Sequence, residues 1–202
     1  MDVVLASSNA GKIKELQDML ADLGVVIIPQ QELSIPDIEE TGLCFVENAI
    51  LKARNAALLS GKPAIADDSG LEVDGLKGEP GVHSAHFGKP SARESQDAAN
   101  RRKILEGLKG KSDRKARMRC VLVFMLEGVV IRAEGICEGR IAEKEQGSGG
   151  FGYDSIFIPD AGGGKTFAEL SREEKNTMSH RALAMNELVK LMHEREIQLV
   201  RP

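Results

Sequence analysis

The sequence contains no tryptophan, one tyrosine and three cysteines, and it has no long apolar run. Because no run approaches about 18 residues, no segment is expected to span a membrane. The odd cysteine count (Cys44, Cys120 and Cys137), without a C-x-x-C spacing, argues against a disulfide framework and against a zinc site. Aromatic residues make up 3% of the chain and the net charge is -4, which disfavours a nucleic-acid-binding module.

The amino terminus is also short of targeting features. Residues 1–6 have no basic region and are too few for a secretory apolar segment, so a cytoplasmic protein is expected. With 202 residues, of which 42% are hydrophobic, the chain is long enough to bury one core, or at most those of two small lobes.

The first thirty residues predict a strand, a turn, a helix and a second strand. Residues 3–6 are continuously apolar, as in a buried strand, and the polar turn 7–11 follows. Apolar side chains then recur at helical spacing, at Ile13, Leu16, Leu20 and Leu23. Gly24 ends that pattern and residues 25–28 form the second strand, which together indicate an α/β sheet.

The rest of the chain continues to mix helical and strand patterns. Helices are expected at 45–59, at 93–108 and from Ser179 onward, and strands at 63–66, 116–126, 129–141 and 156–158. Glu127-Gly128 is typical of a hairpin turn between two long strands. The glycine-rich stretch 69–91 is long enough to indicate a functional or mobile loop.

The first candidate site is the turn before the first helix. Unpaired backbone N–H groups, the helix dipole and a lysine side chain at that point suit a phosphate group. The residues are Ser7, Ser8, Asn9, Ala10, Gly11 and Lys12. The alternative is that Asn9 or Ser8 simply caps the helix.

The second candidate site is acidic and combines Glu39-Glu40 with Asp67-Asp68. The second pair is expected at the carboxyl end of the strand 63–66, where ligands gather in open α/β sheets. Two close carboxylates repel each other, and a bound Mg²⁺ would reverse that repulsion and attract phosphate oxygens. The alternative is a solvated turn, because Asp-Asp-Ser-Gly is ordinary turn composition.

Two further candidates lie in the last third of the chain. Lys175, His180 and Arg181 form a cationic set, and the last two fall in a first helical turn, where cations cost stability unless an anion lies between them. The glycine-rich segment 149–154 contains the one tyrosine beside a phenylalanine, which suits stacking on a flat base. Their alternatives are a surface charge cluster and a tight turn with its aromatic side chains in the core.

Six segments, in order, resemble the Ham1/RdgB-type inosine triphosphate pyrophosphatases. They are Leu5-Ala6-Ser7-Ser8-Asn9-Ala10-Gly11-Lys12, Glu39-Glu40-Thr41-Gly42, Glu47-Asn48-Ala49-Ile50-Leu51-Lys52-Ala53, Ala66-Asp67-Asp68-Ser69-Gly70-Leu71, Gly149-Gly150-Phe151-Gly152-Tyr153-Asp154 and Ser179-His180-Arg181. The resemblance covers nearly the whole chain. It implies an elongated, twisted, mixed β-sheet flanked by helices, in a single domain (1–202) of two lobes with a central cleft, and a homodimer.

The resemblance also implies an activity and a set of site residues. The activity is hydrolysis of ITP, dITP and XTP or dXTP to the monophosphate and pyrophosphate, with Mg²⁺ as cofactor and no nucleic acid or membrane partner. Asp68 corresponds to the general base and a metal ligand, and Glu40 to its carboxylate partner in metal binding. The substrate-binding positions are Ser7, Ser8, Asn9, Ala10, Gly11, Lys12, Lys52, Ser69, Phe151, Gly152, Tyr153, Asp154, Lys175, His180 and Arg181.

These roles lead to one mechanistic hypothesis. Water activated by Asp68 attacks the α-phosphorus, and Mg²⁺ and Lys12 receive the pyrophosphate. Donors such as His180 and Arg181 would hydrogen-bond to the C6 keto oxygen of a purine. They would disfavour adenine, whose amino group at that position would leave them unpaired. His86 and Ser155 depart from residues common in the family. A Maf-like pyrophosphatase and a non-catalytic nucleotide sensor are the alternative functions.

Overall fold

The chain divides into two compact units. The computed structural model describes residues 1–21 and 24–197. Unit 1 comprises residues 1–68, 120–135 and 181–202, and unit 2 comprises residues 69–119 and 136–180. The boundaries fall inside the strands β3 (Ala64–Val73), β4 (Lys115–Leu126) and β5 (Val129–Ile141), so each of these strands contributes residues to both units.

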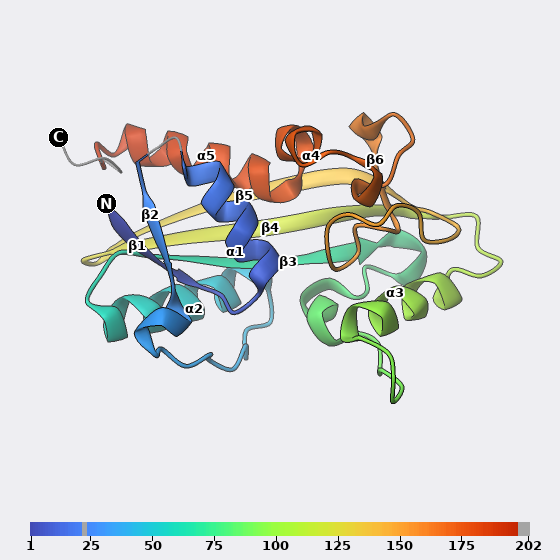
Figure 1. Ribbon diagram of the computed structural model, residues 1–202, viewed down its shortest axis with the longest axis horizontal. Coiled ribbons are helices and arrows are strands. Elements are labelled where there is room, and N and C mark those ends of the chain that lie inside the picture. Colours follow the sequence, from blue (N-terminus) through green and yellow to red (C-terminus); the bar gives the residue numbers. More distant parts are fainter. Residues whose placement is uncertain (22–23, 198–202) are drawn as a thin grey trace. The chain divides into compact units, whose positions relative to one another are not determined.

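The strands form one six-stranded sheet in the order β2-β1-β3-β4-β5-β6 (Figure 1). The strand β1 (Asp2–Ala6) is parallel to β2 (Val26–Pro29) and to β3. The strand β6 (Phe157–Pro159) is antiparallel to β5. Glu127 and Gly128, both with positive φ angles, connect β4 to β5 as the predicted hairpin turn. The predicted mixed sheet of an α/β fold is therefore confirmed.

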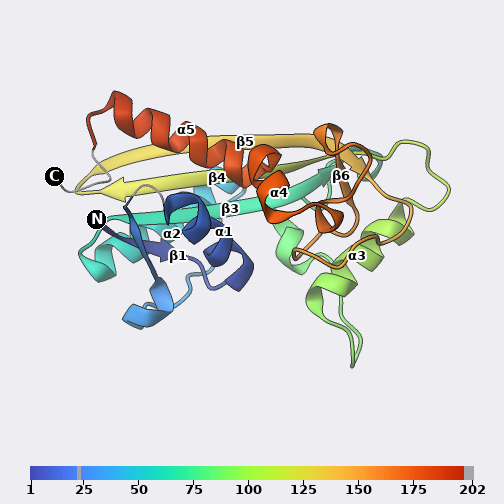
Figure 2. The ribbon, with the colours of Figure 1, turned by 45° about the horizontal axis from the view of Figure 1, so that its top comes forward.

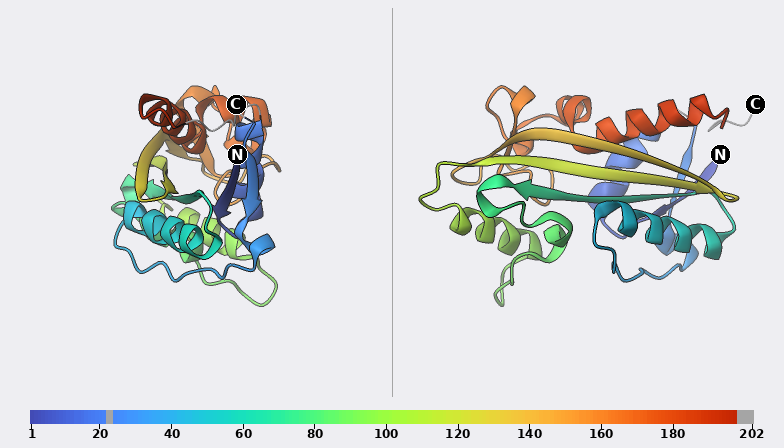
Figure 3. Two further views of the ribbon diagram at one scale, coloured as in Figure 1. Left: turned by 90° about the vertical axis from the view of Figure 1, so that its left-hand side faces the viewer. Right: turned by 180° about the vertical axis from the view of Figure 1, so that it is seen from behind.

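In unit 1, helices cover both faces of the sheet. The helices α1 (Ala10–Leu20) and α5 (His180–Glu194) pack their apolar side chains against one face, and α2 (Phe45–Ser60) lies on the opposite face (Figures 1 and 3). Figure 2 shows α5 running along β4 and β5. The first core contains Leu16 and Leu20 of the predicted helical stripe, whereas Leu23 lies outside the described residues.

Unit 2 has its own apolar core. Its helices are α3 (Gln96–Gly107) and α4 (Arg172–Met178), and α4 begins with the capping box of Ser171 and Glu174. Short 3₁₀ turns at Asp74–Leu76, Gly81–His86, Asp160–Gly162 and Phe167–Glu169 connect the elements. The second core contains Leu71, Val73, Ile104, Leu108, Ala116, Met118, Cys137, Ile141, Tyr153, Ile156, Phe157 and Phe167.

The strand β3 is longer than the sequence pattern predicts. It runs on to Val73, so Asp67 and Asp68 lie in the middle of a strand, and the prediction that the strand ends at residue 66 is wrong. Asp67 is 1% exposed and Asp68 is 5% exposed, so the alternative of a solvated turn is wrong. The strand β1 pairs with β3 only as far as Ala6 opposite Ala66. Beyond that point β1 no longer pairs with β3, and Leu71 N–H of β3 donates instead to Ser84 Oγ at 2.9 Å.

The glycine-rich stretch 69–91 is also more ordered than a single loop. Its first residues belong to β3, and the buried Asn100 of α3 fixes the rest. The Asn100 side chain accepts a hydrogen bond from Gly88 N–H at 2.7 Å and donates to the Ser84 carbonyl at 3.1 Å. A Cβ atom at Gly88 would lie 2.2 Å from the Ala99 carbonyl oxygen, so this close approach requires glycine.

Among residues 1–21 and 24–197, no helix combines the length and the hydropathy that crossing a membrane requires.

Candidate active site

The turn between β1 and α1 carries the predicted phosphate-binding residues. Asn9 is the N-cap of α1, because its Oδ1 accepts a hydrogen bond from Lys12 N–H at 3.1 Å. Its own N–H donates to Ser7 Oγ at 3.2 Å. Capping by Asn9 is therefore confirmed, and Ser8, Asn9 and Ala10 are exposed at the start of the helix. The open N-terminus of α1 retains the dipole and the N–H groups that suit an anion.

The buried carboxylate of Asp67 is the centre of an ion-pair cluster in unit 1. Its Oδ1 lies 2.5 Å from Lys12 Nζ, and its Oδ2 accepts from Arg181 Nε at 2.7 Å. The buried thiol of Cys120 donates to the same Oδ2 at 3.2 Å. Arg181 also pairs with Glu15 of α1 through Nη1. Lys12 and Arg181 each contribute one positive charge, which Asp67 and Glu15 balance.

The cluster keeps its acid and base groups ionised. Burial alone would raise the pKa of Asp67, but the charges of Arg181 and Lys12 outweigh that effect and hold it well below its usual range. Burial alone would lower the pKa of Arg181, and Asp67 and Glu15 raise it instead. The anion that a cation in the first turn of α5 requires is thus supplied by the protein itself, from Asp67 and Glu15.

Lys52 of α2 connects the two predicted metal ligands. Its Nζ donates to Glu40 Oε1 at 2.7 Å, to Asp68 Oδ1 at 2.8 Å and to the Asp67 carbonyl oxygen at 2.8 Å. These three bonds use all three hydrogens of the ammonium group. Lys52 therefore holds Glu40 and Asp68 on one side of β3.

Asp68 has one committed and one available oxygen. Within the described part of the chain, its buried Oδ2 has no hydrogen-bond partner. Burial raises the pKa of Asp68, and the charges of Lys52 and Lys12 only partly offset this effect. Burial would lower the pKa of Lys52, but Asp68 and Glu40 raise it overall. A buried carboxylate with a free lone pair and a raised pKa is suited to accept a proton or to bind a cation.

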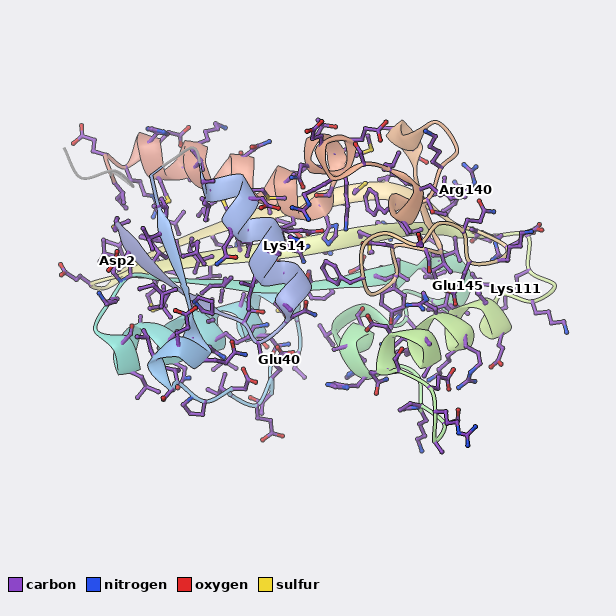
Figure 4. The ribbon with its side chains drawn as sticks, in the orientation of Figure 1. Asp2, Lys14, Glu40, Lys111, Arg140 and Glu145 are labelled. Carbon is purple, nitrogen blue, oxygen red and sulfur yellow. The ribbon has the colours of Figure 1, made fainter. Side chains whose placement is uncertain are left out.

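The connection that follows Glu40 is hydrogen-bonded to the first turn of α2. Gly42 N–H donates to Asn48 Oδ1 at 2.7 Å, and Leu43 N–H donates to Glu47 Oε2 at 2.7 Å. A Cβ atom at Gly42 would lie 2.5 Å from Asn48 Oδ1, so a larger residue would displace this segment. Figure 4 shows Glu40 on the segment that leads into α2.

The carboxylates of this group are few for an all-protein metal cage. Among residues 1–21 and 24–197 there is no group of three or more His, Cys, Asp or Glu side chains that could hold a metal ion. The unpartnered Oδ2 of Asp68 nevertheless fits a hard cation, because carboxylate oxygen is the donor that Mg²⁺ prefers. Such an ion characteristically takes its remaining ligands from water and from substrate phosphates.

The second group of predicted residues lies in unit 2 around a buried ion pair. Lys175 Nζ lies 2.6 Å from Asp154 Oδ2, with their side chains 7% and 4% exposed. The same oxygen accepts from Phe151 N–H at 2.9 Å. The ammonium lies 5.1 Å from the ring centroid of Phe151 and 5.4 Å from that of Phe167. The structure thus brings three of the predicted substrate-binding residues together.

The two aromatic residues of the segment 149–154 are placed differently. Tyr153 is 6% exposed, belongs to the second core and donates its hydroxyl to the Ser84 carbonyl at 2.7 Å. This agrees with the alternative of an aromatic side chain turned into the core. Phe151 is half-buried. Gly152 N–H donates to Asp97 Oδ2 at 2.9 Å, so α3 supports this turn.

The remaining predicted residues are Ser69 and His180. Ser69 follows Asp68 in β3 and is half-buried, whereas His180 is the first residue of α5 and is 5% exposed. The resemblance assigns no role to two residues of the ion-pair cluster, Asp67 and Glu15, although Asp67 belongs to the acidic candidate site. The sequence does carry a signal for Glu15, because it follows Lys12 by three residues and so lies on the same face of a helix.

A comparison with known families decides the relationship. The model of the Ham1 family matches residues 3–191 of this chain. The chain belongs to the Ham1 family. Every candidate residue of this Ham1-family chain falls inside the matched range, and the predicted resemblance is confirmed.

Individual relatives agree over nearly full length. The chain is 50% identical to a dITP/XTP pyrophosphatase of Thioalkalivibrio sulfidiphilus, over 96% of this chain and 100% of the relative. It is 52% identical to a dITP/XTP pyrophosphatase of Methylococcus capsulatus, over 90% of this chain and 91% of that relative. The solved structure of a HAM1 protein from Coxiella burnetii superposes with a TM-score of 0.84 at 44% identity, covering 96% of this chain and 99% of that one.

Proposed function

We propose that this Ham1-family chain hydrolyses non-canonical purine nucleoside triphosphates (dITP, ITP and XTP or dXTP) to the monophosphate and pyrophosphate. The names of its relatives support this substrate class, since two of them are dITP/XTP pyrophosphatases. The observation that carries the proposal is the buried carboxylate of Asp68. One of its oxygens is fixed by Lys52 and the other has no hydrogen-bond partner in the described part of the chain.

Asp68 is the general base in this proposal. Its Oδ2 accepts a proton from the water that attacks the α-phosphorus, while Lys52 keeps the carboxylate in one orientation through Oδ1. Correctly placed general bases contribute roughly 10²- to 10⁴-fold to rate. Lys12 supplies positive charge to the phosphates, because only one of its hydrogens is engaged, with Asp67, among the described residues.

Mg²⁺ is the metal that this donor set suits, with Asp68 and Glu40 as its protein ligands. When bound, the ion would neutralise negative charge on the phosphate oxygens. The charge of Lys52 keeps the two carboxylates close to each other in the absence of that ion. The N-terminal turn of α1, from Ser7 to Lys12, is assigned to the triphosphate chain.

The purine base is assigned to the group in unit 2. Phe151 offers a half-buried ring for stacking, and Lys175 and Asp154 offer a charged donor and acceptor. Ser69, Gly152, Tyr153, His180 and Arg181 complete the proposed set. A keto oxygen at C6 accepts hydrogen bonds from such donors, whereas the adenine amino group would leave them unpaired at a cost of about 1–3 kcal/mol each.

The resemblance extends the proposal beyond the reaction. A single domain of two lobes with a cleft, a homodimer and a cytoplasmic location are proposed on that ground. Binding to nucleic acid is not expected, given the net charge of -4. Sedimentation equilibrium tests the dimer, which is refuted if the mass is that of one 21.8 kDa chain at every concentration measured.

Product analysis tests the proposed function. The purified chain is incubated with dITP, ITP, XTP, GTP, ATP or dTTP, with Mg²⁺ or with EDTA, and the products are separated by anion exchange. We expect pyrophosphate and monophosphate from the first three substrates and no turnover in EDTA. Inorganic phosphate with a diphosphate would mean attack at the γ-phosphorus. Turnover of dTTP alone favours the Maf-like alternative, and binding without turnover favours the sensor.

Three variants test the assigned residues. Asp68→Asn keeps the side-chain shape but cannot accept the proton, so we expect kcat to fall about 100-fold or more. Retention of more than about a tenth of wild-type turnover would refute the general base. Glu40→Gln is expected to raise the Mg²⁺ concentration required for half-maximal rate. Glu39→Gln, at the exposed neighbouring position, is its matched control and is expected to behave as wild type.

A further inference from the structure

Asp67 is adjacent to the proposed general base, yet it faces a different set of partners. Successive residues of a strand direct their side chains to opposite faces of the sheet. Asp68 contacts Lys52 of α2, whereas the Asp67 side chain contacts Lys12 of α1 and Arg181 of α5. The main-chain oxygen of Asp67 also accepts a hydrogen bond from Lys52. Asp67 is therefore bonded to two of the lysines predicted to bind substrate, Lys12 and Lys52.

The Asp67 side chain is out of reach of a substrate. It is 0% exposed, whereas Lys12 is 16% exposed. An effect of Asp67 on the reaction would therefore pass through Lys12, whose ammonium it holds at 2.5 Å. That ammonium is thereby held against β3 at the residue that precedes Asp68.

Two buried donors fix the orientation of the Asp67 carboxylate. Arg181 Nε and the Cys120 thiol both donate to Oδ2, which leaves Oδ1 directed to Lys12. Arg181 in turn pairs with Glu15, which lies on α1 three residues after Lys12. The first two turns of α1 are thus tied to β3 and α5 by one continuous set of ion pairs.

We propose that Asp67 is a positioning residue, which fixes the Lys12 ammonium against β3 at the residue preceding Asp68 and is itself oriented by Arg181 and Cys120. The inference rests on the proposed hydrolysis and adds to it a residue that does not touch the substrate. Without the Asp67 charge, Lys12 keeps its own charge but loses its fixed position. Binding of the triphosphate then persists, while stabilisation of the departing pyrophosphate is weakened.

Kinetics of dITP hydrolysis for Asp67→Asn, Lys12→Met and the double variant test this role. For Asp67→Asn we expect kcat to fall about 10- to 100-fold, because a displacement near 1 Å at a reacting centre has an effect of that size. KM is expected to stay within about threefold of wild type or to fall, since one negative charge is removed from the cluster. The double variant is expected to match Lys12→Met within about threefold.

A merely structural role would give a different pattern. Ile27→Ala, in the first core but outside the ion-pair cluster, is the control for lost stability. It is expected to lower the melting temperature without changing kcat at 25 °C. If Asp67→Asn lowers the rate equally in the wild-type and the Lys12→Met backgrounds, the two residues do not act through each other and the proposal is overturned.

The remaining outcomes are also decisive. If the wild-type protein hydrolyses dITP and Asp67→Asn has the same kcat, the positioning role is overturned and the proposed function stands. An inactive wild type overturns the proposed function and this inference with it. Should Asp67→Asn fail to fold, Cys120→Ala replaces it, because it removes the thiol that donates to Asp67 Oδ2 at a residue with no proposed substrate contact. Its kcat is expected to fall, again without a further effect on Lys12→Met.

Discussion

Replacing Lys175 by methionine removes the ammonium from the buried Lys175–Asp154 pair and leaves the Asp154 carboxylate in place. Both side chains are almost fully buried, at 7% and 4% exposed, so water compensates poorly for the lost ammonium. Methionine approximates the length of lysine, and its sulfur can contact the rings of Phe151 and Phe167. The substitution therefore isolates the loss of charge from the loss of packing.

The size of the effect follows from that burial. Removal of one partner from a buried ion pair typically costs about 3–5 kcal/mol of unfolding free energy. For a chain of this length, each kcal/mol lowers the melting temperature by about 2–4 °C, so Lys175→Met is expected to melt roughly 6–20 °C below wild type. Asp154→Asn removes the carboxylate that faces the buried Lys175 ammonium and is expected to melt in the same range.

The double variant Asp154→Asn/Lys175→Met provides the decisive comparison. It contains no charge at either position, and the asparagine amide oxygen can still accept from Phe151 N–H, so we expect it to be more stable than either single variant. Thermal and guanidinium unfolding followed by circular dichroism measure all four proteins. A double variant less stable than both single variants would refute the reasoning, as would single variants that melt with wild type.

Two further predictions concern the thiols and the β4–β5 turn. Iodoacetamide at pH 8 is expected to modify the native chain at the exposed Cys44 alone, because Cys120 and Cys137 are buried and burial raises the pKa of Cys137 to about 12. Peptide mass spectrometry identifies the modified residue, and rapid modification of Cys137 would contradict its burial. Gly128→Ala places an L side chain at a φ of 87° in open space, so only backbone strain of about 1–2 kcal/mol is expected. Its melting temperature should fall by a few degrees with dITP turnover unchanged, and a wild-type melting curve would show that the turn adapts without strain.

Local patterns in the sequence predict much of unit 1. The apolar run at residues 3–6, the helical stripe with Leu16 and Leu20, and the alanine-rich helix α2 all appear where expected. Each of these depends on residues close together in the chain, where periodicity and capping decide the structure. The Glu127-Gly128 turn is predicted for the same reason. Both positions adopt the positive φ angles of such a turn.

Tertiary partners explain what the sequence does not predict. Asp67-Asp68-Ser69-Gly70 has the composition of a turn, yet its residues continue β3. Asp67 pairs there with Lys12, and Asp68 pairs with Lys52. Arg181 lies 114 residues from Asp67 and 166 residues from Glu15 along the chain. No local pattern encodes pairs at such separations. The ion-pair cluster therefore becomes visible only in the folded chain.

The place of Tyr153 gives unit 2 an optical label of its own. With no tryptophan and no second tyrosine in the chain, ultraviolet fluorescence originates essentially from this one phenol. It lies in the second core, hydrogen-bonded to Ser84, so its emission reports the packing of unit 2. Circular dichroism, in contrast, sums the helices of both units. Denaturation curves from the two signals coincide if the chain unfolds as one cooperative whole and separate if the units melt independently.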